Sequence, residues 1–296
     1  MKNQHAAGAL FRLTLSMVIF GTIGVFVRHI PLPSSVIACV RGLIGMVFLL
    51  LVMRAMGKRV SGAAVRRNLP ALCLSGAGLG LNWILLFEAY RFTSVATATL
   101  CYYLAPIVVM LVSPFVLDER LTARKSICIL TALAGMVFVS GVNEGAAPAA
   151  GELRGILMGL GAACLYAAVV LLNKRVSDIE ALDRTVVQLG VSCAVLAPYI
   201  FLTEDVLSLM AGLTPVPVLL LVFVAVVHTG IAYALYFSSI RNISAQTAAL
   251  FSYVDPVVAI LLSAFFLGER MPVSCAVGAV MILGSALVSE LPGKSK

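Results

Sequence analysis

The stretch RFTSVATATLCYYLAPIVVMLVSPFVLDER, residues 91–120, returns as RNISAQTAALFSYVDPVVAILLSAFFLGER at residues 241–270. Fourteen of the thirty aligned positions are identical, including the pairs Tyr103/Tyr253 and Pro106/Pro256. The chain therefore contains two copies of one unit, and both copies are apolar enough to lie in lipid. Internal duplication of a membrane protein is the usual construction of a secondary transporter, whose binding site lies where the halves meet.

The composition is that of an integral membrane protein. Of the 296 residues, 61% are hydrophobic and 11% are charged, and the mean hydropathy is +1.07. Ordinary soluble domains carry about 25% charged residues. The net charge of +8 comes from basic residues between apolar spans, where they set orientation, so no nucleic-acid partner is expected. The seven cysteines lie in or beside apolar spans without a CxxC pair, and we interpret them as packing residues.

The apolar segments predict an all-α membrane protein with ten transmembrane helices. A spanning helix needs about 20 apolar residues. Such spans are predicted at residues 9–28, 33–53, 70–90, 94–117, 123–142, 153–173, 184–203, 217–239, 243–267 and 272–290. The first five-helix repeat then occupies residues 1–142, a connection occupies residues 143–152, and the second repeat occupies residues 153–296.

The basic residues predict the orientation. Sixteen of the 21 Lys and Arg residues fall on the face that holds both termini, four fall on the other face, and Arg41 lies inside a span. The positive-inside rule places both termini in the cytoplasm. Because each repeat has an odd number of helices, the second copy enters the membrane from the opposite side. The sequence thus predicts inverted repeats in a multi-pass protein of the cytoplasmic (inner or plasma) membrane.

The repeated segments TATLCYYLAPIVVMLVSPFVLDER and TAALFSYVDPVVAILLSAFFLGER, with NWILLFEAYRFTSV and ACVRGLIGMVFLL, resemble the EamA-type members of the drug/metabolite transporter superfamily. The resemblance covers essentially the whole chain and implies a central cavity, with the spans at 123–142 and 272–290 at the periphery. It implies transport of amino acids, other metabolites or drugs, and export as the direction.

Apart from basic residues near the span ends and the acidic residue that ends the last span, four ionisable residues fall inside predicted spans: Asp255, His228, Arg41 and Glu88. A charge in the hydrocarbon costs a few kcal/mol or more, so such residues are candidate functional groups. Asp255 precedes Pro256, which leaves a carbonyl of the previous turn without its helical donor. This predicts a cation or proton site at Asp255, and a structural ion pair with Arg41 is the alternative.

The other three ionisable residues each have a plainer alternative. Arg41 can hold a carboxylate with two parallel hydrogen bonds, or it can bridge helices through backbone carbonyls. His228 titrates near neutral pH and can relay a proton, or it can be a hydrogen-bonded interior residue. Glu88 is a third candidate for proton coupling, unless it extends to the membrane interface.

Aromatic side chains mark the candidate substrate site. Rings deep in the membrane can stack on solutes and hold cations over their faces. The alternative is that these rings only pack against lipid or the protein core. We expect the substrate to contact Arg41, His228, Asp255, Asn82, Trp83, Tyr103, Tyr166, Tyr233 and Tyr253. Pro106 and Pro256 are predicted hinges for alternating access, unless they are static kinks.

The expected function is alternating-access transport, with export of an amino acid or a related zwitterion or amine as the leading hypothesis. A drug or quaternary-ammonium efflux protein is the alternative, and a lipid-handling protein or membrane enzyme is the remote one. The sequence has no GxxxxGK[ST], HExxH, CxxC or GxSxG motif, so no ATP-driven pump, metal, cofactor or enzyme activity is expected. The expected partners are a small-molecule substrate and the bilayer, with proton coupling as an option, in a monomer or homodimer.

Overall fold

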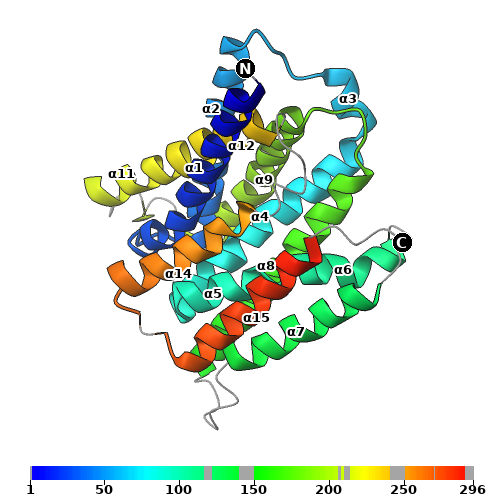
Figure 1. The fold of residues 1–296 in the computed structure, drawn as a ribbon. Coiled ribbons are helices and arrows are strands. Elements are labelled where there is room, and N and C mark those ends of the chain that lie inside the picture. The colour runs from blue at the N-terminus through cyan, green and yellow to red at the C-terminus, as the bar shows by residue number, and fades with distance from the viewer. Residues whose placement is uncertain are drawn as a thin grey trace.

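The computed structural model of the chain is a bundle of helices (Figure 1). It describes residues 2–116, 122–139, 150–205, 208–209, 214–240, 251–269 and 271–290. The helices within these ranges are α1 Lys2–Arg28, α2 Ser34–Ala55, α3 Gly62–Arg67, α4 Leu69–Phe92, α5 Val95–Tyr102, α6 Ala105–Val116, α7 Ala123–Val139, α8 Ala150–Arg175, α9 Ala181–Thr203, α11 Pro215–Phe223, the π-helix η2 Val224–Ile231, α12 Ala232–Ile240, α14 Val254–Phe266 and α15 Val273–Glu290.

Among the described residues, seven helical segments are long and apolar enough to cross a membrane, and each coincides with a predicted span. They are Gly8–Arg28, Ser34–Ala55, Leu69–Phe92, Val95–Val116, Ala150–Arg175, Ala181–Thr203 and Pro215–Ser239. The remaining predicted spans correspond to α7, α14 and α15. The described residues do not include 243–250 of the predicted ninth span, 143–149 of the connection, 140–142 at the end of the first repeat, or 117–121, from the end of the fourth predicted span toward the fifth.

Helices distant in the sequence pack against each other. In the part of the chain that the structure describes, α4 packs along α8 and α9, α1 packs on α12 and α14, and α2 packs on α9 and η2. The helices α7 and α15 lie side by side at one edge of the bundle (Figure 1). A Cβ on Gly278 of α15 would be 2.5 Å from the carbonyl oxygen of Gly135 in α7, so small residues allow this close contact.

Two prolines at the same repeat position break their helices. The helix α5 ends at Tyr102, Tyr103 has φ −72° and ψ 4°, and Pro106 lies in the first turn of α6. In the second copy, Tyr253 has φ −74° and ψ −6°, and Pro256 lies in the first turn of α14. Proline has no N–H for the carbonyl four residues earlier, and it fits the first turn of a helix. The mid-span kinks expected at these prolines are therefore breaks centred on the preceding tyrosines.

The span Pro215–Ser239 contains a segment of π-helix, η2, at Val224–Ile231. Its residue Thr229 lies against α2, where a Cβ on Gly45 would be 2.3 Å from Thr229 Cγ2. π-helical turns are rare and occur often at functional sites. Here η2 directs His228 and Thr229 toward α1 and α2.

We expect Gly45→Ala to destabilise the protein, because the added methyl group would overlap Thr229. Overpacking a tight contact costs about 1–3 kcal/mol, so the thermal midpoint of the purified protein should fall by several degrees. The matched control is Gly284→Ala, since a Cβ on Gly284 of α15 would meet nothing within 4 Å. Equal midpoints for the two variants would contradict the close α2–η2 contact.

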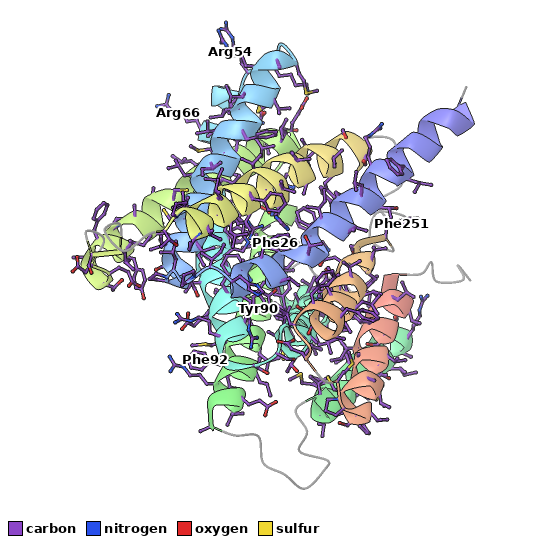
Figure 2. All side chains as sticks on the ribbon, turned by 90° about the vertical axis from the view of Figure 1, so that its left-hand side faces the viewer. Phe26, Arg54, Arg66, Tyr90, Phe92 and Phe251 are labelled. Atoms are coloured by element: carbon purple, nitrogen blue, oxygen red, sulfur yellow. The ribbon has the colours of Figure 1, made fainter. Side chains whose placement is uncertain are left out.

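Ion pairs join the segments between helices at one end of the bundle. Figure 2 places Arg54 and Arg66 at one end and Phe92 toward the other. At the Arg66 end, Lys58 pairs with Glu180 at 2.5 Å and Arg67 pairs with Asp178 at 2.9 Å. These contacts join the segment between α2 and α4 to the segment between α8 and α9.

Candidate functional site

The helix breaks of the two copies meet at Tyr103 and Asp255. The Tyr103 hydroxyl donates a hydrogen bond of 2.6 Å to Asp255 Oδ2 and lies 3.5 Å from the carbonyl oxygen of Ser252. In a regular helix the carbonyl of Ser252 would accept a hydrogen bond from the N–H of residue 256. Pro256 has no N–H, so it cannot donate that bond. The centroids of the Tyr103 and Tyr253 rings are 6.4 Å apart. A tyrosine of the first break therefore supports the carboxylate and backbone of the second break.

Asp255 also lies against α1. A Cβ on Gly21 would be 2.5 Å from the carbonyl oxygen of Asp255 and 2.7 Å from Val258 Cβ. The absence of a side chain at Gly21 thus lets α1 approach the first turn of α14. Asp255 keeps partial exposure as a residue in this packed position.

Arg41 is buried against two aromatic rings, with 5% exposure. Its guanidinium carbon lies 4.2 Å from the Trp83 ring centroid and 5.6 Å from that of Phe87. Its Nε donates a hydrogen bond of 2.7 Å to Thr229 Oγ1. A cation over an aromatic face is stabilised by the ring quadrupole. This geometry fixes the plane of the guanidinium.

The ion pair between Arg41 and Asp255, the alternative raised by the sequence, is not formed in the structure. Asp255 accepts its hydrogen bond from Tyr103, and no ion pair of Arg41 occurs among the described residues. The two charges interact electrostatically across the interior. With Nε engaged by Thr229, the two Nη groups of Arg41 make no hydrogen bond to a described residue. They are the donors that bind a carboxylate in bidentate fashion.

His228 is completely buried in η2. Its Nε2 lies 2.7 Å from Thr22 Oγ1, and the Thr22 hydroxyl donates to the carbonyl of Ile19 at 2.8 Å. Because that hydroxyl has one hydrogen, Nε2 carries the hydrogen of the His228–Thr22 bond. The rings of Phe26 and Phe223 lie edge-on to the imidazole, at centroid distances of 5.4 and 5.9 Å. His228 is thus a hydrogen-bonded interior residue, and a proton-relay role would require the Thr22 contact to open.

Seven of the eight tyrosines gather around Asp255 and Arg41. The ring centroids of Tyr102 and Tyr166 are 5.4 Å apart, and those of Tyr102 and Tyr103 are 6.0 Å apart. Tyr233 lies 5.5 Å from the Phe20 ring. The tyrosines that interact with one or both of the charged groups, directly or through a neighbouring ring, are Tyr90, Tyr102, Tyr103, Tyr166, Tyr233, Tyr236 and Tyr253. Tyr199, exposed on α9, is the exception.

Two predicted residues have other partners. Asn82 is fully buried and donates a hydrogen bond of 2.6 Å to the carbonyl of Ala162, which ties α4 to α8. Glu88 accepts hydrogen bonds from Ser34 Oγ at 2.7 Å and from Arg91 Nη1 at 3.3 Å. Neither contact involves Asp255 or Arg41. The structure therefore joins both residues to helix-packing and helix-end contacts.

Sequence reasoning missed several residues of the site. Thr22 and Thr229 hold His228 and Arg41, and Phe87 lies beside the Arg41 guanidinium. A threonine or phenylalanine in an apolar span carries no signal by itself. For Thr229, the neighbouring His228 was a usable signal, since adjacent polar residues are rare in a span.

The chain matches known transporters over nearly its whole length. The family model described as "EamA-like transporter family" matches residues 7–141 and again residues 153–290. The "Uncharacterized transporter YxxF" of Bacillus subtilis is 31% identical over 97% of this chain and 91% of the relative. "Protein RarD" of Escherichia coli is 25% identical over 67% of this chain and 64% of the relative. A solved crystal structure superimposes with a TM-score of 0.65 at 21% identity, covering 96% of each chain, and therefore shares the fold.

Proposed function

Because the chain belongs to the EamA-like transporter family, and is thus a multi-pass transporter of small molecules in the cell membrane, we propose that it moves a small zwitterionic metabolite by alternating access. An amino acid is the leading class, and export is the direction that the family resemblance implies. The observation that carries the proposal is the meeting of the two helix breaks, where Tyr103 of one copy holds Asp255 of the other. Broken helices at a repeat interface are the usual binding site in secondary transporters.

The proposed architecture has ten spans in two inverted repeats, residues 1–142 and 153–296, with cytoplasmic termini. The family model matches once in each half. The helix contacts are also related by exchange of the two repeats. In the first repeat, α1 packs on α12 and α14 of the second repeat. Its counterpart α8 packs on α4, α5 and α6 of the first repeat. The pairs α2–α9 and α7–α15 each join a helix to its own counterpart. A pseudo-twofold axis in the membrane plane generates this pattern.

The proposed substrate chemistry follows from two opposite charges in one interior. Asp255 would receive the ammonium group or a coupling proton, and the free Nη groups of Arg41 would receive a carboxylate. Trp83, Tyr103, Tyr166, Tyr233 and Tyr253 would form the wall, and His228 would tune the local charge. A zwitterion satisfies both groups at once.

A drug or quaternary-ammonium substrate is the second candidate. The gathering of tyrosines around Asp255 favours it, because aromatic faces bind organic cations. Arg41 opposes it, since its charge acts on the same interior and repels a second cation. The names of the relatives point to transport rather than to catalysis.

The test uses the single tryptophan of the chain, Trp83, which lies under Arg41. The purified protein is titrated with the twenty amino acids, with simple amines and with quaternary-ammonium compounds, while Trp83 fluorescence is recorded. We expect saturable responses from zwitterions, followed by flux of the same compounds into proteoliposomes. Responses from quaternary-ammonium compounds alone would replace the leading hypothesis with the second one. Binding without flux would argue against transport of these solutes.

Alternating access requires both ends of the bundle to open in turn, and one end is closed through Glu269. Arg28 Nη1 donates to the carbonyls of Tyr90 at 2.8 Å and Thr93 at 3.1 Å, and pairs with Glu269 Oε1 at 3.0 Å. Glu269 Oε2 accepts from the Val95 N–H at 2.9 Å and from the Ser263 hydroxyl. In the proposed topology this cluster closes the outer end.

We expect Glu269→Gln to favour opening at this end. Loss of a partly buried ion pair of about 1–2 kcal/mol changes a two-state population about 5- to 30-fold. Cys275 is buried and lines a small cavity with Glu269, so its alkylation by an impermeant maleimide from outside should accelerate by a similar factor. The control is Glu180→Gln, which neutralises the more exposed pair at the other end. Unchanged alkylation of Cys275 in Glu269→Gln would refute the role of this ion pair.

A further inference from the structure

Arg184 is an arginine whose side chain has no hydrogen-bond or ion-pair partner in the part of the chain that the structure describes. The sequence places it at the boundary of a span, among the basic residues of the predicted cytoplasmic face, and in the structure it lies in the first turn of α9. Its side chain is half-buried, and its Nε is inaccessible without a hydrogen-bond partner. Its backbone N–H bonds the carbonyl of Glu180, but no hydrogen bond or ion pair joins its side chain to the described residues. A buried donor left without an acceptor is costly, so this geometry suits a group that binds an acceptor supplied from outside.

The charge of Arg184 acts on two tyrosines of the central group. It interacts electrostatically with the hydroxyl groups of Tyr236 and Tyr166. The Tyr166 ring is 5.4 Å from Tyr102, which is 6.0 Å from Tyr103, and Tyr103 bonds Asp255. Tyr166 retains 37% exposure although it belongs to this interior group. A row of aromatic rings thus leads to Asp255 from Tyr166, one of the two tyrosines on which the charge of Arg184 acts.

The acidic residues next to Arg184 in the chain bind other groups. Asp183 Oδ2 accepts a hydrogen bond of 3.1 Å from the Ser61 N–H. Glu180 pairs with Lys58. The positive charge of Arg184 is therefore not neutralised locally, and the N-terminus of α9 adds a favourable potential for anions.

We propose that Arg184 is a second anion-binding position, which takes the carboxylate of the substrate at the α9 end of the tyrosine row before that carboxylate reaches Arg41. This inference rests on the proposed function and narrows it, because it requires an acidic group on the substrate. A partly exposed charge at the entry of a site acts mainly on the association rate and on its salt dependence. Arg184 is thus a specificity-determining residue for carboxylates.

The experiment compares a carboxylate with its neutral amide. The probes are the amino acid that changes Trp83 fluorescence most in the titration above, and its carboxamide. Stopped-flow fluorescence gives their association and dissociation rates for the wild type, Arg184→Gln and Arg184→Lys at low and high salt. The matched control is Arg66→Gln, which removes an exposed positive charge at the same end of the bundle (Figure 2).

We expect Arg184→Gln to slow association of the amino acid about tenfold at low salt, within the range of electrostatic steering, and to flatten its salt dependence. Association of the amide and dissociation of both probes should stay unchanged, and Arg184→Lys should keep most of the rate. Equal slowing of acid and amide, or the same effect from Arg66→Gln, would overturn the inference. Absence of any amino-acid response in the wild type would instead refute the proposed substrate class, and the inference with it.

Discussion

Asp255→Asn is expected to abolish transport while leaving the fold intact. The asparagine side chain has the same shape and can still accept the Tyr103 hydrogen bond, so the two helix breaks stay joined. What disappears is the negative charge that would hold an ammonium group or a proton. Loss of a charge-assisted contact of about 3 kcal/mol predicts a fall in proteoliposome flux of at least about 100-fold.

The variant Tyr103→Phe tests the hydrogen bond between the two helix breaks separately from the charge of Asp255. It keeps the Asp255 carboxylate and removes the hydroxyl that supports it and Ser252. We expect a lower thermal midpoint and a smaller loss of flux, about tenfold or less, since one neutral donor is removed. Wild-type flux in Asp255→Asn, or a larger loss in Tyr103→Phe, would show that the carboxylate serves only to join the breaks.

Arg41→Gln is expected to eliminate binding of carboxylate substrates without lowering stability. A buried charge without an ion-pair partner carries a desolvation cost, and removal of that cost offsets the loss of the contacts to Trp83 and Thr229. Binding of a carboxylate through two parallel charged hydrogen bonds would be lost, with a fall in affinity of about 100-fold for a loss of about 3 kcal/mol. Trp83 emission should also change in the free protein, because the guanidinium leaves its ring face.

The comparison with Arg41→Lys tests the geometry rather than the charge. Lysine keeps a cation but lacks the planar fork that stacks on Trp83 and presents two donors, so intermediate affinity is expected. Thr229→Val removes the acceptor that holds Arg41 Nε and should weaken the same ligands modestly. Unaltered affinity of Arg41→Gln for an amino acid, measured against its amide, would assign Arg41 to helix packing instead.

The spans, the duplication and the family could be predicted from local patterns. Hydrophobic length identifies a helix in lipid, so seven predicted spans coincide with helices long and apolar enough to cross the membrane. The family expectation is confirmed by the match over both halves. The proline positions predicted the irregularities in two spans, because the missing N–H acts within one turn.

Other features depended on neighbours that no local pattern specifies. The π-helical turn around His228 has no proline or glycine pair that requires it at that point, and it allows Thr229 to meet Arg41. Asn82, grouped with the aromatic wall in the sequence, binds the backbone of Ala162 instead. The electrostatic interaction of Arg184 with Tyr236 and Tyr166, which belong to other helices, also has no local sequence signal.

The sequence by itself determined that the chain is a duplicated, helical membrane protein of this transporter family, because span length, repeat identity and proline chemistry are properties of short segments. Only the tertiary structure decided which polar groups meet. Asp255 bonds Tyr103 rather than Arg41, and Arg41 stacks on Trp83. Those choices follow from the approach of helices from opposite halves, set by contacts such as Gly21 on Asp255 and Gly45 on Thr229. Such contacts join residues more than a hundred positions apart, where sequence periodicity carries no information.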